Sequence, residues 1–459
     1  MSVPRLVLCG LEPGPALALA AGALLARCDG ERAVRAVSVG VDLPLWRLLN
    51  DSPGRAPRVL DPALHDDSML ELYDSWSAGC DLVLIVSVEP VLDRWQGVKG
   101  SRAVDVAAGL DAPLVLVLDA RERGATAAAA AYGVKAMAGR VELAGIIVVG
   151  GDERGSGAEL GRLLRGQVGV PVLGWIPPQL SEQFVRQYKA AVGGGLRQIG
   201  PRPVKGGEQR LCAEAATYLD EDELMAAASR RGFMPARPRR LLTPAPGASG
   251  LTLAVAWGPP LEPFALENVD LLQAMGVTLA PLDISRDREL PPDASGLLLA
   301  GGMDEEELPA FAGNAALKEA LARAVADGLP TLARGGGALL LLGRLADSRG
   351  RSHDLVGVLP AEAELLEWYE RPRYVRAHAT PVNPFDRGDN VLYELFDLEF
   401  LLLEQESFAY QVGDPGEEGQ AEGFARGHCL ATTLYASLPR CPSMAASLLD
   451  AMRLAGPRP

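Results

Sequence analysis

The stretch RLVLCGLEPGPALALAAG, residues 5–22, decides the fold of the first half of the chain. It begins with a short apolar run, residues 6–9, without alternating polar side chains, which is typical of a strand covered on both faces of a parallel sheet. Residues 10–15 are rich in Gly and Pro and predict a turn. The Ala- and Leu-rich segment after it predicts a helix, and Pro15 suits its first turn.

The same alternation of buried strand and helical segment continues along the chain. Further parallel strands of the first half are expected at residues 82–87, 114–119, 145–149 and 172–176. The Ala-rich residues 127–138 predict a crossover helix. In the second half, apolar runs predict strands at residues 251–256, 277–282, 297–300 and 330–333.

The length and one irregular segment predict two domains. A chain of 459 residues exceeds one ordinary core. The hydrophobic periodicity of strands and helices ends in FMPARPRRLLTPAPGASG. The four prolines of this segment exclude a helix interior or a central strand. We therefore predict an α/β protein with two doubly wound domains, residues 1–232 and 251–459, joined by the linker 233–250. The Gly/Pro-rich residues 193–207 are expected to be a surface excursion of the first domain.

Charge and cysteine usage limit the function classes. A formal net charge of -15 argues against a nucleic-acid partner or an anionic membrane surface. Six cysteines and four histidines are scattered without metal-ligand spacing, so no metal site is predicted and the cysteines are expected to stay reduced. The N-terminus lacks the pattern of a secretory signal, and residues 16–26 are too short a run to span a bilayer. We expect a cytoplasmic protein.

Segments from both halves are similar to one known family. The first half contains, in order, PRLVLCGLEPGPALALAAG, SVGVDLPLW, DAPLVLVLDAR, LAGIIVV and VPVLGWIPP. The second half contains LPPDASGLLLAGG, AGNAALKEALARAVADGLP, ARGGGALLLLG and LVGVLP. They resemble the ATP-binding and glutamine amidotransferase domains of the cobyrinic acid a,c-diamide synthase family. The resemblance implies a P-loop-NTPase-like sheet followed by a class I glutamine amidotransferase-like, flavodoxin-like domain. Family members use ATP and glutamine-derived ammonia to convert tetrapyrrole carboxylates to carboxamides.

The segment of this chain that corresponds to the family's phosphate loop departs from the family pattern. Such a loop cradles phosphates with backbone N–H groups and ends in Gly-Lys-Thr, whose lysine and hydroxyl hold phosphate and Mg²⁺. Gly10 and Gly14 keep the glycines of the turn, but Leu17 stands at the lysine position and Ala18 at the hydroxyl position. Two prolines remove N–H donors, and Glu12 adds negative charge. We therefore expect neither ATP nor Mg²⁺ to bind, whereas a tetrapyrrole stays a candidate cofactor.

Two acidic positions of the nucleotide domain persist. Asp42 and Asp93 match family acidic residues near Mg²⁺ and substrate, and together with Gly10 and Gly14 they are the remnants of a cofactor site. The family's Glu-Gly after the strand at residues 82–85 is replaced by Val86-Ser87. An aspartate at a strand end also serves as a helix cap or turn former, and that interpretation is the more frequent one.

The resemblance implies that the glutaminase residues are absent. Such enzymes need a thiolate on a strand-to-helix turn, a histidine that activates it and an oxyanion site. The thiol position is Gly335 and the histidine position is Tyr435. Tyrosine, with an ordinary pKa of about 10, is no base near neutral pH. Cys429 and the neighbouring His428 match no family catalytic position, so the expected set of catalytic residues is empty. The oxyanion-side Gly-Gly-Tyr-Pro-Glu motif is here residues 301–305.

Residues 367–412 depart most from the family. They hold nine of the 24 aromatic residues of the chain. Arg371, Arg373, Tyr374 and Arg376 are candidates for a ligand or partner site, because aromatics with arginines anchor interfaces and arginines clamp carboxylates. The alternative is that the aromatics pack the domain core. Residues 372–389 are expected to be a surface loop, and residues 398–412 a pair of core strands or a strand and a helix.

Three functional hypotheses remain open at this point. The first is a non-catalytic binding, scaffold or regulatory protein, as a homodimer or in a complex with an enzyme or active relative, with a tetrapyrrole as one candidate ligand. The second is an active ATP-dependent amidotransferase or ligase that amidates tetrapyrrole carboxylates with free ammonia. The third is a subunit of a larger redox or cofactor-maturation complex that docks through residues 367–412.

Overall fold

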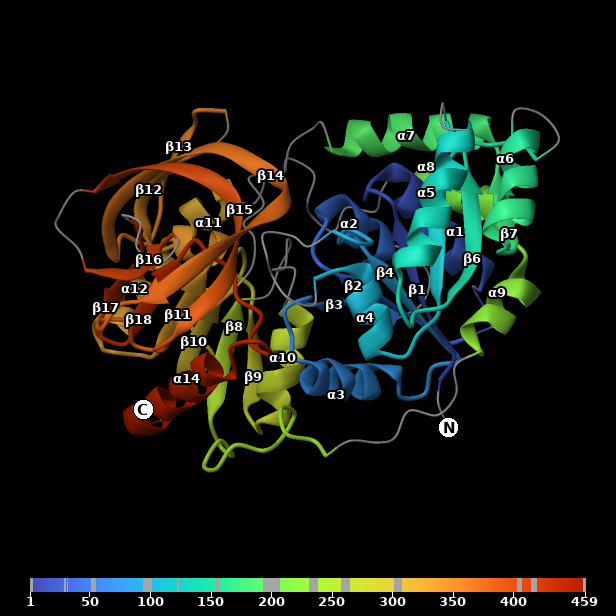
Figure 1. Cartoon of the computed structure of the whole chain (residues 1–459). Helices are drawn as coiled ribbons and strands as arrows, with labels where there is room; N and C mark the ends of the chain where they lie inside the picture. The colour runs from blue at the N-terminus through green and yellow to red at the C-terminus, as the bar shows by residue number, and fades with distance from the viewer. Residues whose placement is uncertain are drawn as a thin grey trace. The chain divides into compact units, whose positions relative to one another are not determined.

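The structure is a computed structural model of the whole chain (Figure 1). The chain divides into two compact units, residues 1–193 with 202–240 and residues 194–201 with 241–459. The division at 240/241 falls within the segment 233–250. The structure describes residues 3–28, 30, 32–50, 55–93, 101–121, 124–153, 157–192, 207–230, 238–256, 265–300, 308–347, 349–402, 407–413 and 419–456.

The first unit is built on a seven-stranded parallel sheet of order β3-β2-β4-β1-β5-β6-β7. Its strands are β1 Arg5–Gly10, β2 Val34–Val39, β3 Arg55–Leu60, β4 Leu82–Ser87, β5 Leu114–Asp119, β6 Leu143–Val149 and β7 Val172–Ile176. The five strands predicted in this half are confirmed. β2 and β3 were not predicted, because arginines interrupt both apolar runs.

Helices cover both faces of this sheet, as predicted for a doubly wound domain (Figure 1). On one face α1 Pro15–Arg27 packs with α2 Leu43–Asn50, α7 Pro178–Val192 and α8 Gly207–Ala216. The other helices are α3 Asp66–Ser77, α4 Ala103–Gly109, α5 Gly124–Met137, α6 Ala158–Leu163, the π-helical η1 Leu164–Val168 and α9 Glu221–Ala228. The predicted crossover helix corresponds to α5.

The second unit contains an 11-stranded mixed sheet of order β13-β12-β14-β16-β17-β18-β11-β10-β8-β9, with β15 paired to β14. Its parallel strands are β8 Thr252–Ala256, β9 Thr278–Leu282, β10 Ala294–Leu299, β11 Thr331–Arg334 and β18 Cys429–Thr432. The remaining strands are β12 Leu342–Ala346, β13 Ser352–Asp354, β14 Leu359–Ala379, β15 Asp389–Leu402, β16 Phe408–Val412 and β17 Gln420–Arg426. The helices are α10 Ala265–Ala274, α11 Leu308–Gly313, α12 Ala315–Ala326, α13 Gly336–Leu339 and α14 Pro442–Ala455.

The predicted surface loop at residues 372–389 is wrong for its first half. β14 continues to Ala379 and pairs antiparallel with β15, so the loop is limited to residues 380–388. The pairing of Tyr374 with Tyr393 and of Val375 with Leu392 outweighs the turn-forming tendency of the prolines. Residues 398–412 contain the end of β15 and all of β16, which confirms the pair of strands.

Two further expectations concern the whole chain. All six cysteines are free and buried, as predicted for reduced thiols. No helix in the described part of the chain is both long and apolar enough to cross a membrane.

Candidate functional site

The strand-to-helix turn after β11 keeps the backbone of a nucleophile elbow. β11 ends at Arg334, α13 begins at Gly336, and Gly335 between them has φ 53° and ψ −130°. Side-chain-bearing residues rarely adopt this conformation, and a nucleophile in such an elbow is held there under strain. The Gly335 N–H donates to the Thr432 carbonyl of β18 at 2.8 Å. Gly335 therefore lies at the strand-to-helix turn, and the turn presents no side chain at this position.

Tyr435 fills the space that an elbow side chain would need. A Cβ atom built on Gly335 would lie 1.9 Å from Tyr435 Cζ and 2.2 Å from its hydroxyl oxygen. The ring is buried, with 1% exposure. Its hydroxyl accepts a hydrogen bond from the Gly336 N–H at 3.2 Å. The amide that follows a nucleophile is the usual oxyanion donor. The phenol of Tyr435 thus fills the space of a nucleophile side chain and accepts the hydrogen bond of the Gly336 amide.

Several elements hold the segment that carries Tyr435. Its backbone pairs with that of Tyr393 in β15, with N–H to carbonyl distances of 2.9 and 2.7 Å. The Ala436 carbonyl accepts hydrogen bonds from Arg334 Nη1 at 2.7 Å and from Asn268 Nδ2 at 3.2 Å. Arg334 and Asn268 are themselves buried. The position of the ring is therefore fixed from β11, α10 and β15.

Glu422 in β17 organises the turn before Tyr435, and no pattern in the sequence points to this residue. Its carboxylate accepts from Thr432 Oγ1 at 2.7 Å, from Thr433 N at 2.8 Å and from Thr433 Oγ1 at 2.9 Å. Burial raises the pKa of Glu422, the Thr hydrogen bonds oppose this, and the nearby charge of Glu394 raises it further. The carboxylate thus holds, through these hydrogen bonds, the turn from which the Tyr435 side chain reaches the elbow.

Cys429 lies away from the elbow. It pairs with Thr331 at the start of β11, whereas Thr432 pairs with Arg334 at its end. Three residues of strand correspond to about 10 Å. Burial raises the pKa of the Cys429 thiol to about 12. A buried thiol of this kind is inert at neutral pH. The motif at residues 301–305 lies outside the described residues.

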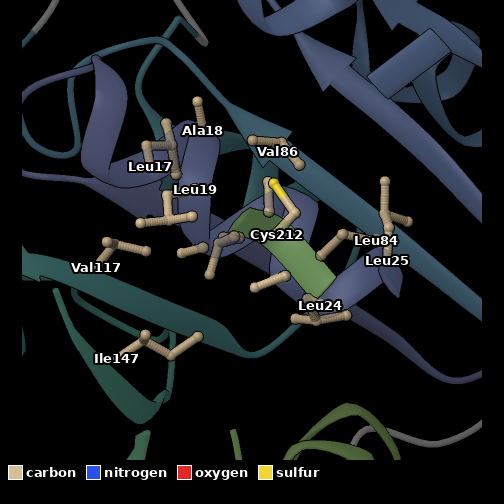
Figure 2. Close-up of a cluster of buried hydrophobic side chains, with 14 of the residues drawn as sticks. Leu17, Ala18, Leu19, Leu24, Leu25, Leu84, Val86, Val117, Ile147 and Cys212 are labelled. Carbon is tan, nitrogen blue, oxygen red and sulfur yellow. The ribbon is translucent and has the colours of Figure 1, made fainter. Parts of the chain in front are cut away.

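The phosphate-loop segment keeps its turn and packs its functional positions into the core. Gly10 ends β1, and Gly14 precedes α1 with φ 149°. Leu17 and Ala18 are 2% and 1% exposed, whereas Glu12 is exposed. Figure 2 shows Leu17 and Ala18 within the buried cluster that also contains Val86 of β4 and Val117 of β5. The two residues expected at the family's lysine and hydroxyl positions are therefore apolar core residues.

Asp42 has a structural task at the end of β2. Its Oδ1 accepts from Leu45 N at 2.9 Å and so caps α2, and it also accepts from Tyr188 Oη of α7 at 3.2 Å. Asp93, the other acidic remnant, is exposed in the bend after β4. β2, β4 and β1 are parallel neighbours in the sheet. Both aspartates therefore follow strands whose carboxyl ends lie at the same edge of the sheet as Gly10.

One buried carboxylate at this edge was missed. Glu89 lies two residues after Ser87, the end of β4, and is 6% exposed. Its Oε1 approaches Gly40 so closely that a Cβ there would lie 2.3 Å away. The Ser87 hydroxyl is buried and has no hydrogen-bond partner among the described residues. No cluster of three or more His, Cys, Asp and Glu side chains suited to a metal occurs in the described part of the chain.

The candidate partner residues lie on the β14–β15 hairpin. Arg373 and Arg376 are exposed, and Arg373 stands opposite Glu394 in the strand register. The half-buried Tyr374 packs on Tyr393, with ring centroids 4.6 Å apart and an interplanar angle of 55°. Arg371 belongs to β14, and its side chain lies outside the described residues. The structure thus brings Tyr374 next to the residue that pairs with Tyr435, a connection that sequence spacing does not reveal.

Comparisons with known proteins agree with both halves of the chain. Residues 252–434 match the CobB/CobQ-like glutamine amidotransferase domain. The cobyrinate a,c-diamide synthase of Dehalococcoides mccartyi strain CBDB1 is 25% identical, over 98% of this chain and 98% of its own. The enzyme of the same name from D. mccartyi strain 195 is 26% identical, over 86% and 89%.

The solved structures that align with this chain do so at low scores. A glutamine amidotransferase has a TM-score of 0.34 and 16% identity, covering 44% of this chain and 98% of its own. The sequence relatives, by contrast, extend over both units and keep their order. The chain is therefore similar over nearly its whole length to cobyrinate a,c-diamide synthases, and its second half matches a CobB/CobQ-like glutamine amidotransferase domain.

Proposed function

We propose that this chain is a non-catalytic member of its family, acting as a binding, scaffold or regulatory protein. The observation that carries the proposal is the overlap between the Tyr435 ring and the space of any side chain at residue 335. A built Cβ lies 1.9 Å from Tyr435 Cζ, far below a van der Waals contact. A nucleophile at 335 and a tyrosine at 435 exclude each other.

The described residues at this turn do not include the thiolate and the base that glutamine hydrolysis requires. The reaction needs a thiolate that attacks the amide carbon and a base that takes up the thiol proton. The elbow offers a phenol whose ordinary pKa is about 10. The Gly336 amide, which would stabilise the oxyanion, already donates to that phenol. Cys429, at the opposite end of the strand pair, does not supply the thiolate.

The nucleotide half supports the same proposal. The positions of the phosphate-loop lysine and hydroxyl, Leu17 and Ala18, are buried in apolar core. Asp42, an acidic remnant, caps α2. We infer that Mg-ATP is not bound and that neither half performs the family reaction.

The proposed binding site is the hairpin surface, defined as Arg373, Tyr374 and Arg376. Arginines pair with carboxylates, and a tyrosine adds an apolar face with a polar edge. The relatives are named for cobyrinate, a tetrapyrrole acid. A tetrapyrrole carboxylate is therefore the ligand we propose, within a homodimer or a complex with an active relative. Six free, buried cysteines fit a reducing cytoplasm.

The proposal is tested with the full chain in two assays. Mg-ATP should leave the melting temperature unchanged, since a ligand that binds only the folded state raises it. Cobyrinic acid should bind, and the double variant Arg373→Gln/Arg376→Gln should weaken that binding about 10-fold or more. Exposed Arg286→Gln is the matched control. A rise of several degrees with Mg-ATP, or ¹⁵N-ammonia appearing in a cobyrinate amide, would establish the amidating enzyme instead.

A further inference from the structure

Three tyrosines connect the hairpin surface to the elbow. The Tyr374 ring of β14 packs on the Tyr393 ring of β15 at 4.6 Å. The Tyr393 backbone exchanges two hydrogen bonds with that of Tyr435, and the Tyr435 hydroxyl accepts from Gly336 N. Tyr393 and Tyr435 are each 1% exposed. The three tyrosines therefore form a continuous series of contacts from the hairpin to the elbow, and two of them are almost fully buried.

The Tyr393–Tyr435 pair is a separate attachment of β15. Along the described part of β15, the strand ladder is formed with β14 alone. The bridge between Tyr393 and Tyr435 is isolated and belongs to no ladder. β14 itself continues to β12 and β16. The second strand of the hairpin is thus tied to the segment after β18 by this backbone pair. Two further hydrogen bonds join the same elements, from Arg440 Nη1 to the Val391 carbonyl at 2.9 Å and from Cys441 Sγ to Asn390 Oδ1 at 3.2 Å.

The Tyr435 end of this connection is rigidly held. Glu422 accepts three hydrogen bonds from Thr432 and Thr433, which fixes the turn. Arg334 and Asn268 hold the next carbonyl, that of Ala436. A residue fixed on both sides imposes its position on whatever packs against it, because close-packed interiors transmit displacement.

We propose that Tyr435 is the positioning residue of the hairpin surface. The substitution at the family's histidine position then has two effects: the ring blocks the elbow, and its backbone sets where Tyr393 and therefore Tyr374 lie. The former glutaminase centre serves as the anchor of the proposed binding surface. This inference takes the role of that surface from the proposed function, but its structural content stands separately.

The test follows the environment of the tyrosine rings in the full chain. All nine tyrosines are replaced by 3-fluorotyrosine, and the ¹⁹F resonances of Tyr374 and Tyr393 are assigned by substitution with Phe. Tyr435→Leu should shift or broaden both resonances and speed hydrogen exchange of the Tyr393 amide by about tenfold or more. Tyr435→Phe, which keeps the ring, should restore the Tyr374 resonance.

Two further variants keep the result interpretable. Phe311→Ala opens a cavity at another buried aromatic of the same unit, in α11, and should leave both resonances in place. Glu422→Gln disturbs the turn while leaving Tyr435 intact and should shift Tyr393. An unmoved Tyr374 resonance in Tyr435→Leu, or an equal shift in Phe311→Ala, overturns the proposal. Failure of cobyrinic acid to bind, with these shifts present, would defeat the proposed ligand alone.

Discussion

At Gly335 the chain adopts φ 53° and ψ −130°, and the ring of Tyr435 stands where a side chain would begin. The two residues depend on each other. Glycine permits both the backbone conformation and the close approach of the ring. The hydrogen bond from Gly335 N to the Thr432 carbonyl and the one from Gly336 N to the Tyr435 hydroxyl hold the turn in this conformation.

A double-mutant cycle measures this dependence. Gly335→Ala should lower the free energy of unfolding by about 3 kcal/mol or more, through backbone strain and overpacking together. In a Tyr435→Ala background the same change should cost about 1–3 kcal/mol, the backbone strain alone. Urea unfolding gives both values.

Gly328→Ala is the control for the cycle. Gly328 also has positive φ, 83°, but no atom lies within 4 Å of a built Cβ. Its substitution should cost about 1–2 kcal/mol in either background. Equal losses at Gly335 with and without the Tyr435 ring would show that the two residues are independent.

Among the elements, α1 packs closely against α8. Gly22 lets α8 approach α1, since a Cβ there would lie 2.4 Å from Cys212 Sγ. Figure 2 shows Cys212 within the cluster that also contains Leu17 and Leu24. The helix that follows a phosphate loop in the family is here buried along its N-terminal turns.

The α1–α8 contact predicts a specific loss of stability. Gly22→Ala should destabilise the chain by about 1–3 kcal/mol through overpacking, although alanine is the better helix former. In the Cys212→Ala background the loss should largely vanish, because the sulfur is gone. Gly133→Ala in α5, where no atom lies within 4 Å, should stabilise slightly in thermal melts. A loss at Gly22 that persists without the sulfur would contradict the packing described.

The hairpin carries a pH-dependent contact at its turn. His378 Nδ1 lies 2.8 Å from Asp389 Oδ1, and its Nε2 lies 3.3 Å from the Gly413 carbonyl. The Asp389 hydrogen bond raises the pKa of His378. A raised folded-state pKa gives stability that is complete below the ordinary histidine pKa of about 6.5 and is lost as pH rises through the folded value.

Substitution of His378 tests that sign. The stability lost in His378→Gln, relative to the unsubstituted chain, should be larger at pH 5.5 than at pH 8.5. Because both groups are partly exposed, the difference should be small and should shrink in high salt. The control is His428→Gln at an exposed position. In this variant, hydrogen exchange of the hairpin amides should not show the pH-dependent loss expected for His378→Gln. A loss that is greater at high pH would refute the ion pair.

For the whole molecule, the sequence was sufficient to predict the α/β class and the five strands of the first half that it named. Those features follow from apolar runs, which are local. The strand-to-helix turn at Gly335 was expected from the family resemblance and not from a local pattern. The extent of β14 was not predictable locally, because its pairing with β15 overrides the prolines. Glu422, Glu89 and the Tyr374–Tyr393–Tyr435 connection depend on strand neighbours distant in sequence.

Similarity over the whole chain and the side chains of particular sites are separate properties of this molecule. Relatives match it over both units, while the described residues have the phenol of Tyr435 at the turn of Gly335 and the apolar Leu17 in the first helix. A fold is retained by its core, whereas an activity depends on a few side chains. The proposed absence of activity therefore rests on these side chains and not on the fold.

The most direct test is ¹⁵N-glutamine hydrolysis by the purified full chain, followed as glutamate and ammonia release. A Gly335→Cys/Tyr435→His variant is measured in parallel and is checked for a thiol that reacts with iodoacetamide. The unsubstituted chain should release no glutamate above the buffer rate, and the new thiol of the double variant, from which the tyrosine ring has been removed, should react. Turnover of glutamine by the unsubstituted chain would contradict the central claim.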